Sequence, residues 1–374
     1  MERRDFLKGA GIVTAAGLAG CTGGPTEGGS GDGDGGGNGS GNGSNGTGGG
    51  SAEAAAQIAM VYATGGLGDG SFNDQAQQGV IEAKKKLNVA YEEGEPSSES
   101  DFSTFQRQYA QSTSPDFDLV CCIGYLQTDA LKNTAPEFPD QKFMIVDSVV
   151  DAKNVASYVF KEQDGSYLAG QLAGLLTTTD FSAGAGKTNG DAKVGFVGGV
   201  EGSLIGRFEA GYEAGVKAAN PDVEVLSNYV GSFNDPTGGK ETALSQYNQG
   251  ADIIYHASGN TGTGVFQAAQ EQGRFAIGVD RDQSVTKENF ADVILASMVK
   301  RVDTAVFTSI EAVVNGEFEG GQTTTLGLKD DGVELVYGQQ LGGSISGEVK
   351  SRIQTAQEKI IDGTITVPTD PSKV

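Results

Sequence analysis

Histidine, cysteine and tryptophan are nearly missing from this chain: one histidine, three cysteines and no tryptophan occur among 374 residues. Nucleophilic catalysis needs a base held beside the nucleophile, and His256 forms no such arrangement with the cysteines. Cys121 and Cys122 adjoin within the apolar run FDLVCCIGY, where neighbours on a strand point to opposite faces and a mutual disulfide is disfavoured. We interpret both as small core residues, and we expect no enzymatic activity and no cofactor.

Positive charge is scarce as well. The chain has 26 Lys and Arg against 49 Asp and Glu, which gives a net charge of −23. Such a surface repels the phosphates of nucleic acids, so we expect no nucleic-acid partner. The acidic residues are spread along the chain, a pattern that resembles proteins from high-salt environments, where dense screening weakens self-repulsion. We expect a monomer with a small-molecule ligand.

A long hydrophobic run is also missing, because the one apolar segment, in MERRDFLKGAGIVTAAGLAGC, is short and rich in glycine and alanine. It follows Arg3 and Arg4, a pair typical of twin-arginine export signals, and it ends in LAGC, which resembles a lipoprotein lipobox. We therefore predict a signal over residues 1–21, lipidation of Cys21, and an exported protein held at the outer face of the cell membrane. The alternative is an uncleaved N-terminal anchor.

Residues 22–54 contain almost no apolar side chains and are dominated by Gly, Ser, Asn, Asp and Thr. Such a composition cannot bury a core and predicts a flexible tether between lipid and folded body. Three Asn-Gly-Ser/Thr sequons, at Asn38, Asn42 and Asn45, could accept glycans on this exposed segment or could be incidental to its composition.

The sequence after the tether contains the same pattern of alternating strand-like and helix-like segments twice. The first pass has the apolar runs IAMVYA, VAYEEG, LVCCIGY and KFMIVDS, and the second has KVGFVGG, VEVLSNYVG, DIIYHASG and RFAIGVDRD. Helix-like segments separate these runs, which indicates an α/β fold with parallel sheets. We predict two similar, doubly wound lobes.

Ligands of doubly wound sheets bind outside the carboxyl ends of the strands. Matching strand ends of the two passes should therefore line a cleft between the lobes. The alignment pairs the loop 64–73 with 199–208, residues 95–102 with 233–238, Tyr125 with 258–259, and Asp147 with Asp280. The two aspartates each close an apolar strand and suit ligand hydroxyl groups such as those of a ribose; a helix-cap or turn role is the alternative for each.

The glycine-rich stretch GLGDGSFND, residues 66–74, follows the first strand. Its spacing is not that of a dinucleotide fingerprint, and Asp69 with Asp74 provides too few oxygen ligands for a metal loop. Asp74, with Gln77 three residues on, fits a helix cap, and Asp69 fits a turn. Phe72 and Asn73 remain for the ligand. His256 is interpreted as a packed residue or hinge-side contact, with a ligand contact as the alternative.

Six motifs follow one another in the order seen in one family. They are GDGSFND, FKEQDGSYLAGQLAG, VGFVGG with FEAGYEAGVKAA, GADIIYHASGNTGTGVFQAA, IGVDRDQ and SMVKRVDTAV. Together they resemble the basic membrane protein (BMP, PnrA-like) family of substrate-binding lipoproteins of ABC importers, from about residue 57 onward. The resemblance implies a type I periplasmic-binding-protein fold with a hinge, a nucleoside ligand held by lobe closure, and a permease with its ATPase as partners.

The resemblance also implies particular ligand contacts. The family's two purine-stacking phenylalanines match Phe72 and Phe233, with Asn73 beside the first. Its ribose-binding aspartate matches Asp280, and its ligand-side glycine and lysine match Gly259 and Lys300. Together with the positions taken from the repeat, the candidate ligand-binding residues are Phe72, Asn73, Tyr125, Asp147, Phe233, Gly259, Asp280 and Lys300.

One departure concerns the base edge: Ala63 stands in VYATGG where many members of the family carry an aspartate. This leaves open another nucleoside or a different small polar ligand such as a sugar. A receptor or sensor ectodomain of the same fold is the other functional alternative. The expected bounds are a binding domain over 55–374, with lobe 1 at about 55–160 plus 297–325, lobe 2 at about 161–296 plus 326–345, and a C-terminal helix and tail over 346–374.

Overall fold

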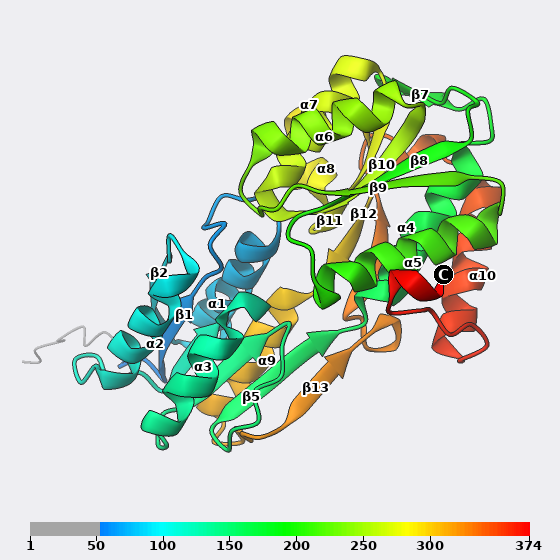
Figure 1. Ribbon diagram of the computed structural model, residues 1–374. Helices are drawn as coiled ribbons and strands as arrows, with labels where there is room; N and C mark the ends of the chain where they lie inside the picture. Colours follow the sequence, from blue (N-terminus) through cyan, green and yellow to red (C-terminus); the bar gives the residue numbers. More distant parts are fainter. Residues whose placement is uncertain (1–52) are drawn as a thin grey trace, which may run out of the picture. The chain divides into compact units, whose positions relative to one another are not determined.

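The computed structural model describes residues 53–374 (Figure 1). The predictions for the export signal, for Cys21, for most of the tether and for the sequons at Asn38, Asn42 and Asn45 lie outside these described residues. Within residues 53–374, no helix has the length and apolar character needed to cross a membrane.

The first lobe is built on an all-parallel sheet with the strand order β2-β1-β3-β4-β5-β13. Its strands are β1 (Gln57–Val61), β2 (Ala90–Gly94), β3 (Leu119–Cys122), β4 (Phe143–Val146), β5 (Val155–Phe160) and β13 (Thr323–Leu326). Its helices are α1 (Phe72–Leu87), α2 (Phe102–Gln111), α3 (Thr128–Thr134) and α9 (Val302–Val314). The central strands β3 and β4 are buried at every residue, as expected for parallel strands covered on both faces.

The second lobe repeats this order as β9-β8-β10-β11-β12-β14, with β14 antiparallel to β12. Its strands are β8 (Lys193–Gly198), β9 (Glu224–Tyr229), β10 (Ala251–Ala257), β11 (Phe275–Asp280), β12 (Ile294–Lys300) and β14 (Val333–Tyr337). The helices that follow or flank them are α4 (Glu162–Leu176), α5 (Ser203–Ala219), α6 (Pro236–Asn248), α7 (Gly262–Gln272), α8 (Gln283–Thr286) and α10 (Gly347–Ile361). A small hairpin, β6 (Ser182–Ala183) with β7 (Gly186–Lys187), lies between α4 and β8.

The matching strand orders confirm the two-lobed α/β fold inferred from the sequence repeat. Each lobe has the 2-1-3-4-5 order of doubly wound sheets, extended by one strand from the C-terminal part of the chain. The sequence repeat contained only four strands a pass and missed the fifth strand of each lobe, β5 and β12, because a short apolar run cannot be assigned to strand or helix by periodicity alone.

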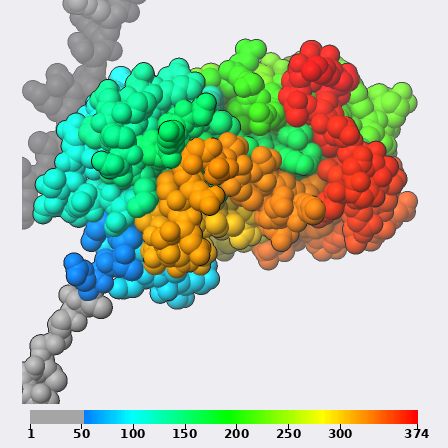
Figure 2. Space-filling view, turned by 90° about the horizontal axis from the view of Figure 1, so that it is seen from below, coloured from blue at the N-terminus to red at the C-terminus, as the bar shows by residue number. Residues whose placement is uncertain are grey.

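The chain crosses between the lobes three times: after β5, after β12, and between β13 and β14. Figure 1 shows α9 and β13, in gold and orange, returning to the first lobe, and Figure 2 shows this segment against the cyan and green residues of that lobe. The expected crossing near residue 297 moves to Arg301, because β12 pairs with β11 and β14 along its whole length. Backbone bonds from Lys161 N to Leu326 O and from Arg301 N to Gly332 O, both 2.9 Å, tie the crossings together.

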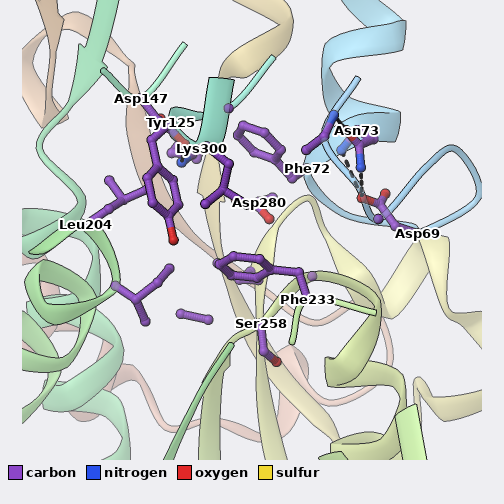
Figure 3. Close-up of a pocket in the computed structure, with 18 of the residues that line it drawn as sticks. Asp69, Phe72, Asn73, Tyr125, Asp147, Leu204, Phe233, Ser258, Asp280 and Lys300 are labelled. Atoms are coloured by element: carbon purple, nitrogen blue, oxygen red, sulfur yellow. Dashed lines mark hydrogen bonds and ion pairs between the residues drawn. The ribbon is translucent and has the colours of Figure 1, made fainter. Parts of the chain in front are cut away.

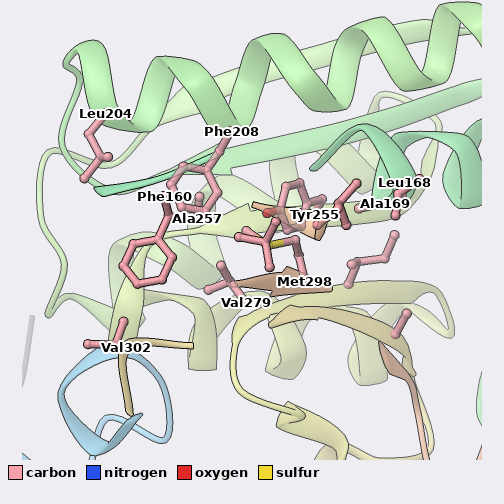
Figure 4. Close-up of a cluster of buried hydrophobic side chains, with 14 of the residues drawn as sticks. Phe160, Leu168, Ala169, Leu204, Phe208, Tyr255, Ala257, Val279, Met298 and Val302 are labelled. Atoms are coloured by element: carbon pink, nitrogen blue, oxygen red, sulfur yellow. The ribbon is translucent and has the colours of Figure 1, made fainter. Parts of the chain in front are cut away.

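Two glycine-rich helices, α4 and α5, pack against each other in the second lobe. A Cβ at Gly170 would lie 2.0 Å from the carbonyl oxygen of Tyr212, and one at Gly215 would lie 2.1 Å from that of Tyr167. The glycines of GSYLAGQLAG and FEAGYEAG therefore allow the two backbones to touch. Figure 4 shows the buried cluster beneath this pair, where Phe208 from α5 lies near Phe160 at the end of β5.

Candidate functional site

A cavity lies between the lobes at the carboxyl ends of both sheets, with about 640 Å³ of empty space when the open solvent at its mouth is included. All eight candidate residues named from the sequence line it, and their role as ligand contacts stays a prediction. The structure brings together Phe72, Asn73, Tyr125, Asp147, Phe233, Gly259, Asp280 and Lys300. Four come from the first lobe and four from the second.

Aromatic rings form two sides of the cavity. Phe72 is the first residue of α1, and Phe233 lies in the loop between β9 and α6. Figure 3 shows their rings on opposite sides of the space, with Tyr125 at its edge. Tyr125 follows β3 and meets Phe233 edge to face, with ring centroids 6.4 Å apart. The lobes thus present rings to the same space from different directions.

The apolar surface continues onto the first turns of α5. Leu204, Ile205 and Phe208 line the cavity together with Ala63 and Gly124. The sequence alignment placed the segment 199–208 in the cleft, but it did not single out these three side chains. The sequence pattern that could have predicted their place in the cavity is a set of apolar residues at helical spacing directly after a strand-end loop.

A buried ion pair closes one end of the cavity. The Lys300 Nζ atom lies 2.7 Å from Asp147 Oδ2, and both side chains are almost fully buried. The ammonium group also lies 4.8 Å from the centroid of the Phe72 ring. Burial lowers the pKa of Lys300, but the carboxylates of Asp147, Glu162 and Asp280 outweigh burial and raise it above its usual value. Lys300 is therefore a permanent cation at neutral pH.

Glu162, which the sequence reasoning missed, stands behind this pair at the start of α4. Its carboxylate is fully buried, 3.9 Å from Lys300 Nζ and 3.7 Å from an Arg207 nitrogen. Burial raises its pKa to about 7, against the favourable charge of Lys300. Neither of its carboxylate oxygens accepts a hydrogen bond within the described residues. Its only sequence signal was its place in the motif FKEQDGSYLAGQLAG.

Asp147 and Asp280 are structurally equivalent. Asp280 ends β11 and Asp147 directly follows β4, and both adopt positive φ angles, 65° and 68°, which aspartate tolerates better than most residues. Asp280 Oδ2 accepts a hydrogen bond from Ser71 Oγ at 2.6 Å. Burial raises the pKa of Asp280 to about 6, although Lys300 and the Ser71 hydroxyl act in the opposite direction.

The loop before α1 is held by two aspartates. Asp69 accepts hydrogen bonds from the backbone of Ser71, Asn73 and Asp74 and from the Asn73 amide. Figure 3 shows Asp69 and Asn73 joined in this way. The other polar atom of Asn73 accepts from the backbone N–H of Ala63 at 2.9 Å. Asn73 lines the cavity, but both ends of its amide are used to fix the loop.

The interpretation of Asp74 as a helix cap is wrong. The helix begins at Phe72 with Ser71 as its N-cap residue, three residues before Asp74. Asp74 instead accepts hydrogen bonds from the backbone of Gly68 and Gly70, at 2.7 and 2.8 Å. The glycine-rich loop folds back over the first turn, which puts its N–H groups within reach of this side chain.

His256 lies outside the cavity lining, as a packed residue. Its Nε2 atom is 2.9 Å from Gln283 Oε1, and its Nδ1 atom is 3.2 Å from Ser258 Oγ. Gln283 Oε1 also accepts from the backbone N–H of Val279, so His256 donates from Nε2. Burial lowers the pKa of His256 to about 4, and the ring stays neutral. Gly259, at φ 56°, starts the turn into α7 beside Phe233.

Two doubly wound lobes with a cavity at their facing strand ends are the arrangement of a solute-binding protein of the type I periplasmic fold. Residues 56–371 match the family model described as ABC transporter substrate-binding protein PnrA-like. The chain belongs to this family, whose members are substrate-binding proteins of ABC transporters and not enzymes. A small-molecule ligand and an ABC permease as partner follow from that membership.

Named relatives and solved structures agree with this. The chain is 39% identical over 333 residues to the CD4+ T-cell-stimulating antigen of Listeria monocytogenes, covering 84% of this chain and 88% of that protein. It is 34% identical over 329 residues to the ABC transporter nucleoside-binding protein BmpA of Lactococcus lactis, covering 83% and 88%. A solute-binding protein structure of an Aeropyrum pernix ABC transporter system matches with a TM-score of 0.74 and 30% identity, over 85% and 95% of the two chains.

The N-terminus matches a known export signal as well. Residues 1–20 fit the model of the twin-arginine translocation signal, which agrees with the prediction from Arg3 and Arg4. Together with the family, this signal identifies an exported protein that faces the outside of the cell.

Proposed function

We propose that this protein captures a nucleoside between its lobes and delivers it to the permease of an ABC importer. The observation that carries the proposal is the pairing of two opposed rings, Phe72 and Phe233, with a polar end made by Asp147, Asp280 and Lys300. A flat base and a hydroxylated sugar need these two surfaces side by side. The similarity to BmpA of Lactococcus lactis, an ABC transporter nucleoside-binding protein, supports the same ligand class.

The base would stack between the two rings. Each aromatic contact would contribute about 0.5–1.5 kcal/mol beyond the burial of apolar area. Leu204, Ile205 and Phe208 extend the apolar wall and exclude water from the base. Since Ala63 provides no acceptor at the base edge, base selectivity would come from ring contacts and backbone groups, which tolerate more than one base.

The ribose would lie at the polar end. Asp147 Oδ1 and the Tyr125 hydroxyl are buried without a hydrogen-bond partner in the described part of the chain, and a buried polar group without a partner costs about 1–3 kcal/mol. Sugar hydroxyls can serve both, because each can donate and accept. Asp280 offers its second oxygen, and Lys300 keeps ammonium protons that Asp147 does not use.

Membrane attachment is part of the proposal. Cys21 would carry a lipid, residues 22–54 would act as the tether, and Asn38, Asn42 and Asn45 would be exposed for glycosylation. The intact-mass spectrum of the protein purified from its own cells tests each modification. A spectrum in which the wild-type chain lacks the added mass of a lipid would exclude the lipid anchor.

Calorimetry on the full chain tests the ligand. A panel of adenosine, guanosine, inosine, cytidine, uridine and thymidine is titrated, with adenine, ribose and arabinose as comparisons. We expect at least one nucleoside to bind more tightly than its free base and than ribose. Tight binding of a sugar, with no response to any nucleoside, would overturn the nucleoside assignment and leave the solute-binding class intact.

A further inference from the structure

Two residues of the first lobe, Gly70 and Ser71, form hydrogen bonds directly to the second lobe. Ser71 Oγ donates to Asp280 Oδ2 at 2.6 Å, and Thr286 Oγ1 donates to the Gly70 carbonyl oxygen at 2.8 Å. Gln283 Nε2 approaches the same carbonyl at 3.4 Å. Ser71 and Asp280 are 0% and 5% exposed, so the bond between them lies in a low-dielectric interior where it is strong.

The first-lobe side of this contact is rigid. Five backbone N–H groups between Gly68 and Asp74 donate to the carboxylates of Asp69 and Asp74. Gly70 has a φ of 63°, which glycine adopts without strain. The Ser71 hydroxyl is therefore held in one place relative to Phe72, which follows it in the chain, and it cannot follow Asp280 if the lobes separate.

On the other side, Asp280 has few partners. The charged groups that face it are Lys300 from β12, Asp69 from the loop before α1, and Asp147 after β4. Two of these three are carboxylates, which oppose its ionisation. The Ser71 hydroxyl favours the ionised form, because it donates a hydrogen bond to it. It also fixes the rotation of the carboxylate, which leaves one oxygen free for the cavity.

We propose that Ser71 is a positioning residue for Asp280. Closure of the lobes brings the Ser71 hydroxyl onto the Asp280 carboxylate and so orients the free carboxylate oxygen toward the ligand. Together with the Gly70–Thr286 bond, the Ser71–Asp280 bond acts as a latch that stabilises the closed form. Ligand capture and closure are then coupled through one side chain, since the group that binds the ligand is complete only when the lobes meet. The orienting role rests on the proposed ligand role of Asp280; the latch does not.

Small-angle scattering of the full chain without ligand tests the latch alone. Ser71→Ala removes the interlobe bond to Asp280, and Thr286→Val removes the interlobe bond to Gly70 at nearly constant shape, while Thr286→Ser keeps the hydroxyl as the matched control. We expect a larger radius of gyration for the first two variants than for the wild type and the control. Equal radii for all four proteins would overturn the latch, whatever the ligand proves to be. Should Ser71→Ala fail to fold, the two Thr286 variants decide.

The pH dependence of nucleoside binding tests the positioning role. Binding that needs ionised Asp280 weakens as the pH falls through its pKa, about 6 in the wild type. Without the Ser71 hydroxyl this pKa is higher, so in Ser71→Ala the loss begins at a higher pH. The Thr286 hydroxyl bonds to the Gly70 carbonyl and not to Asp280, so the pH midpoint of Thr286→Val stays that of the wild type.

Both variants also lose affinity at neutral pH. We expect a loss of about tenfold for Ser71→Ala, since its bond is to a charged group, and a smaller loss for Thr286→Val. The probe is the tightest-binding nucleoside of the calorimetry panel. An unchanged pH midpoint in Ser71→Ala would overturn the positioning role. Absence of any nucleoside binding would overturn the proposed function instead, with the scattering result left standing.

Discussion

At the scale of single residues, the cleft gathers three carboxylates, Asp147, Glu162 and Asp280, around one ammonium group, Lys300. A second buried cation at the ligand is lacking in the described residues that line the cavity. Such a site favours neutral ligands with many hydroxyl groups over phosphorylated ones, because a phosphate would face uncompensated negative charge in a poorly screened interior.

The proposed ribose role of Asp280 leads to a first prediction. Asp280→Ala should weaken nucleoside binding at least about tenfold, the effect of losing hydrogen bonds to a charged group. It should change the affinity for the free base much less, because in the proposed binding mode the base stacks on Phe72 and Phe233. Calorimetry with a nucleoside and its base measures both. Equal losses for the two ligands would remove the ribose role.

Glu162 gives a second prediction, on stability and pH. Its pKa is raised from 4.5 to about 7 by burial, so the native state binds a proton more tightly than the unfolded state. The ionised group therefore costs stability, and the cost grows as the pH rises from 4.5 toward 7 and then levels off. Glu162→Gln, which resembles the protonated form, should match the wild type in acid.

At higher pH the same variant should be more stable, by at most about 3 kcal/mol from the size of the shift. Chemical unfolding across a pH series measures the difference in the free energy of unfolding. Parallel pH curves for Glu162→Gln and the wild type would show that Glu162 is paired well enough by Lys300 and Arg207 to keep an ordinary pKa.

The sequence predicted the position of a residue in the fold where that residue has a fixed place in the repeat. Asp147 and Asp280 were paired by the alignment of strand ends, and the structure gives them the same backbone conformation. Glu162 was missed, because a glutamate in the first turn of a helix normally serves the helix dipole in solvent. Its burial arises only where the chain crosses between lobes, and that crossing is invisible in local sequence.

At the scale of elements, the α4–α5 pair shows why two glycine-rich motifs stand in the sequence. Gly215→Ala should destabilise the protein by about 1–3 kcal/mol, the usual cost of overpacking, because the added Cβ would meet the Tyr167 carbonyl at 2.1 Å. Backbone atoms cannot rotate away as a side chain would. The helices would have to separate along a contact that buries most of α4.

Gly206→Ala is the matched control in the same helix. Its nearest neighbour would be Pro371 at 3.6 Å, an ordinary contact, so the substitution should be neutral or stabilising by up to about 1 kcal/mol through helix propensity. Urea unfolding of both variants makes the comparison. Similar values for the two would mean that helix spacing at Gly215 adapts at little cost.

The order of the elements was predictable because the sequence repeats: the same pattern of strands and helices occurs in both lobes, and each occurrence supports the assignment of the other. The bounds of β12 could not be predicted from the sequence, because SMVKRVD has the pattern of one continuous segment. In the structure, the first half of this segment pairs with β11 and its second half begins α9. At the start of α1, the helix-cap role predicted for Asp74 was wrong. The roles of Asp69, Asn73 and Asp74 depend on how a glycine-rich loop folds back on a helix start, and glycine leaves that path undetermined in the sequence.

At the scale of the whole molecule, the charge of −23 sets a condition on stability. Like charges destabilise the compact state through self-repulsion, and salt screens them over a Debye length that falls from about 10 Å at about 0.1 M to about 3 Å at about 1 M. Unfolding lets these charges move apart, so the native state gains more from screening than the unfolded state does.

The thermal midpoint of the full chain should therefore rise steeply as KCl increases toward about 1 M, and more slowly above it, because little remains to be screened. Differential scanning calorimetry in a KCl series measures this, with sucrose at matched concentrations as a non-ionic control. A midpoint that rises only above about 1 M, and equally in sucrose, would indicate exclusion of co-solvent from the surface instead of screening. That outcome would contradict the link between acidic composition and a high-salt environment. It would mean that repulsion between the negative charges does not lower the stability of the native state, so that screening by salt could not raise it.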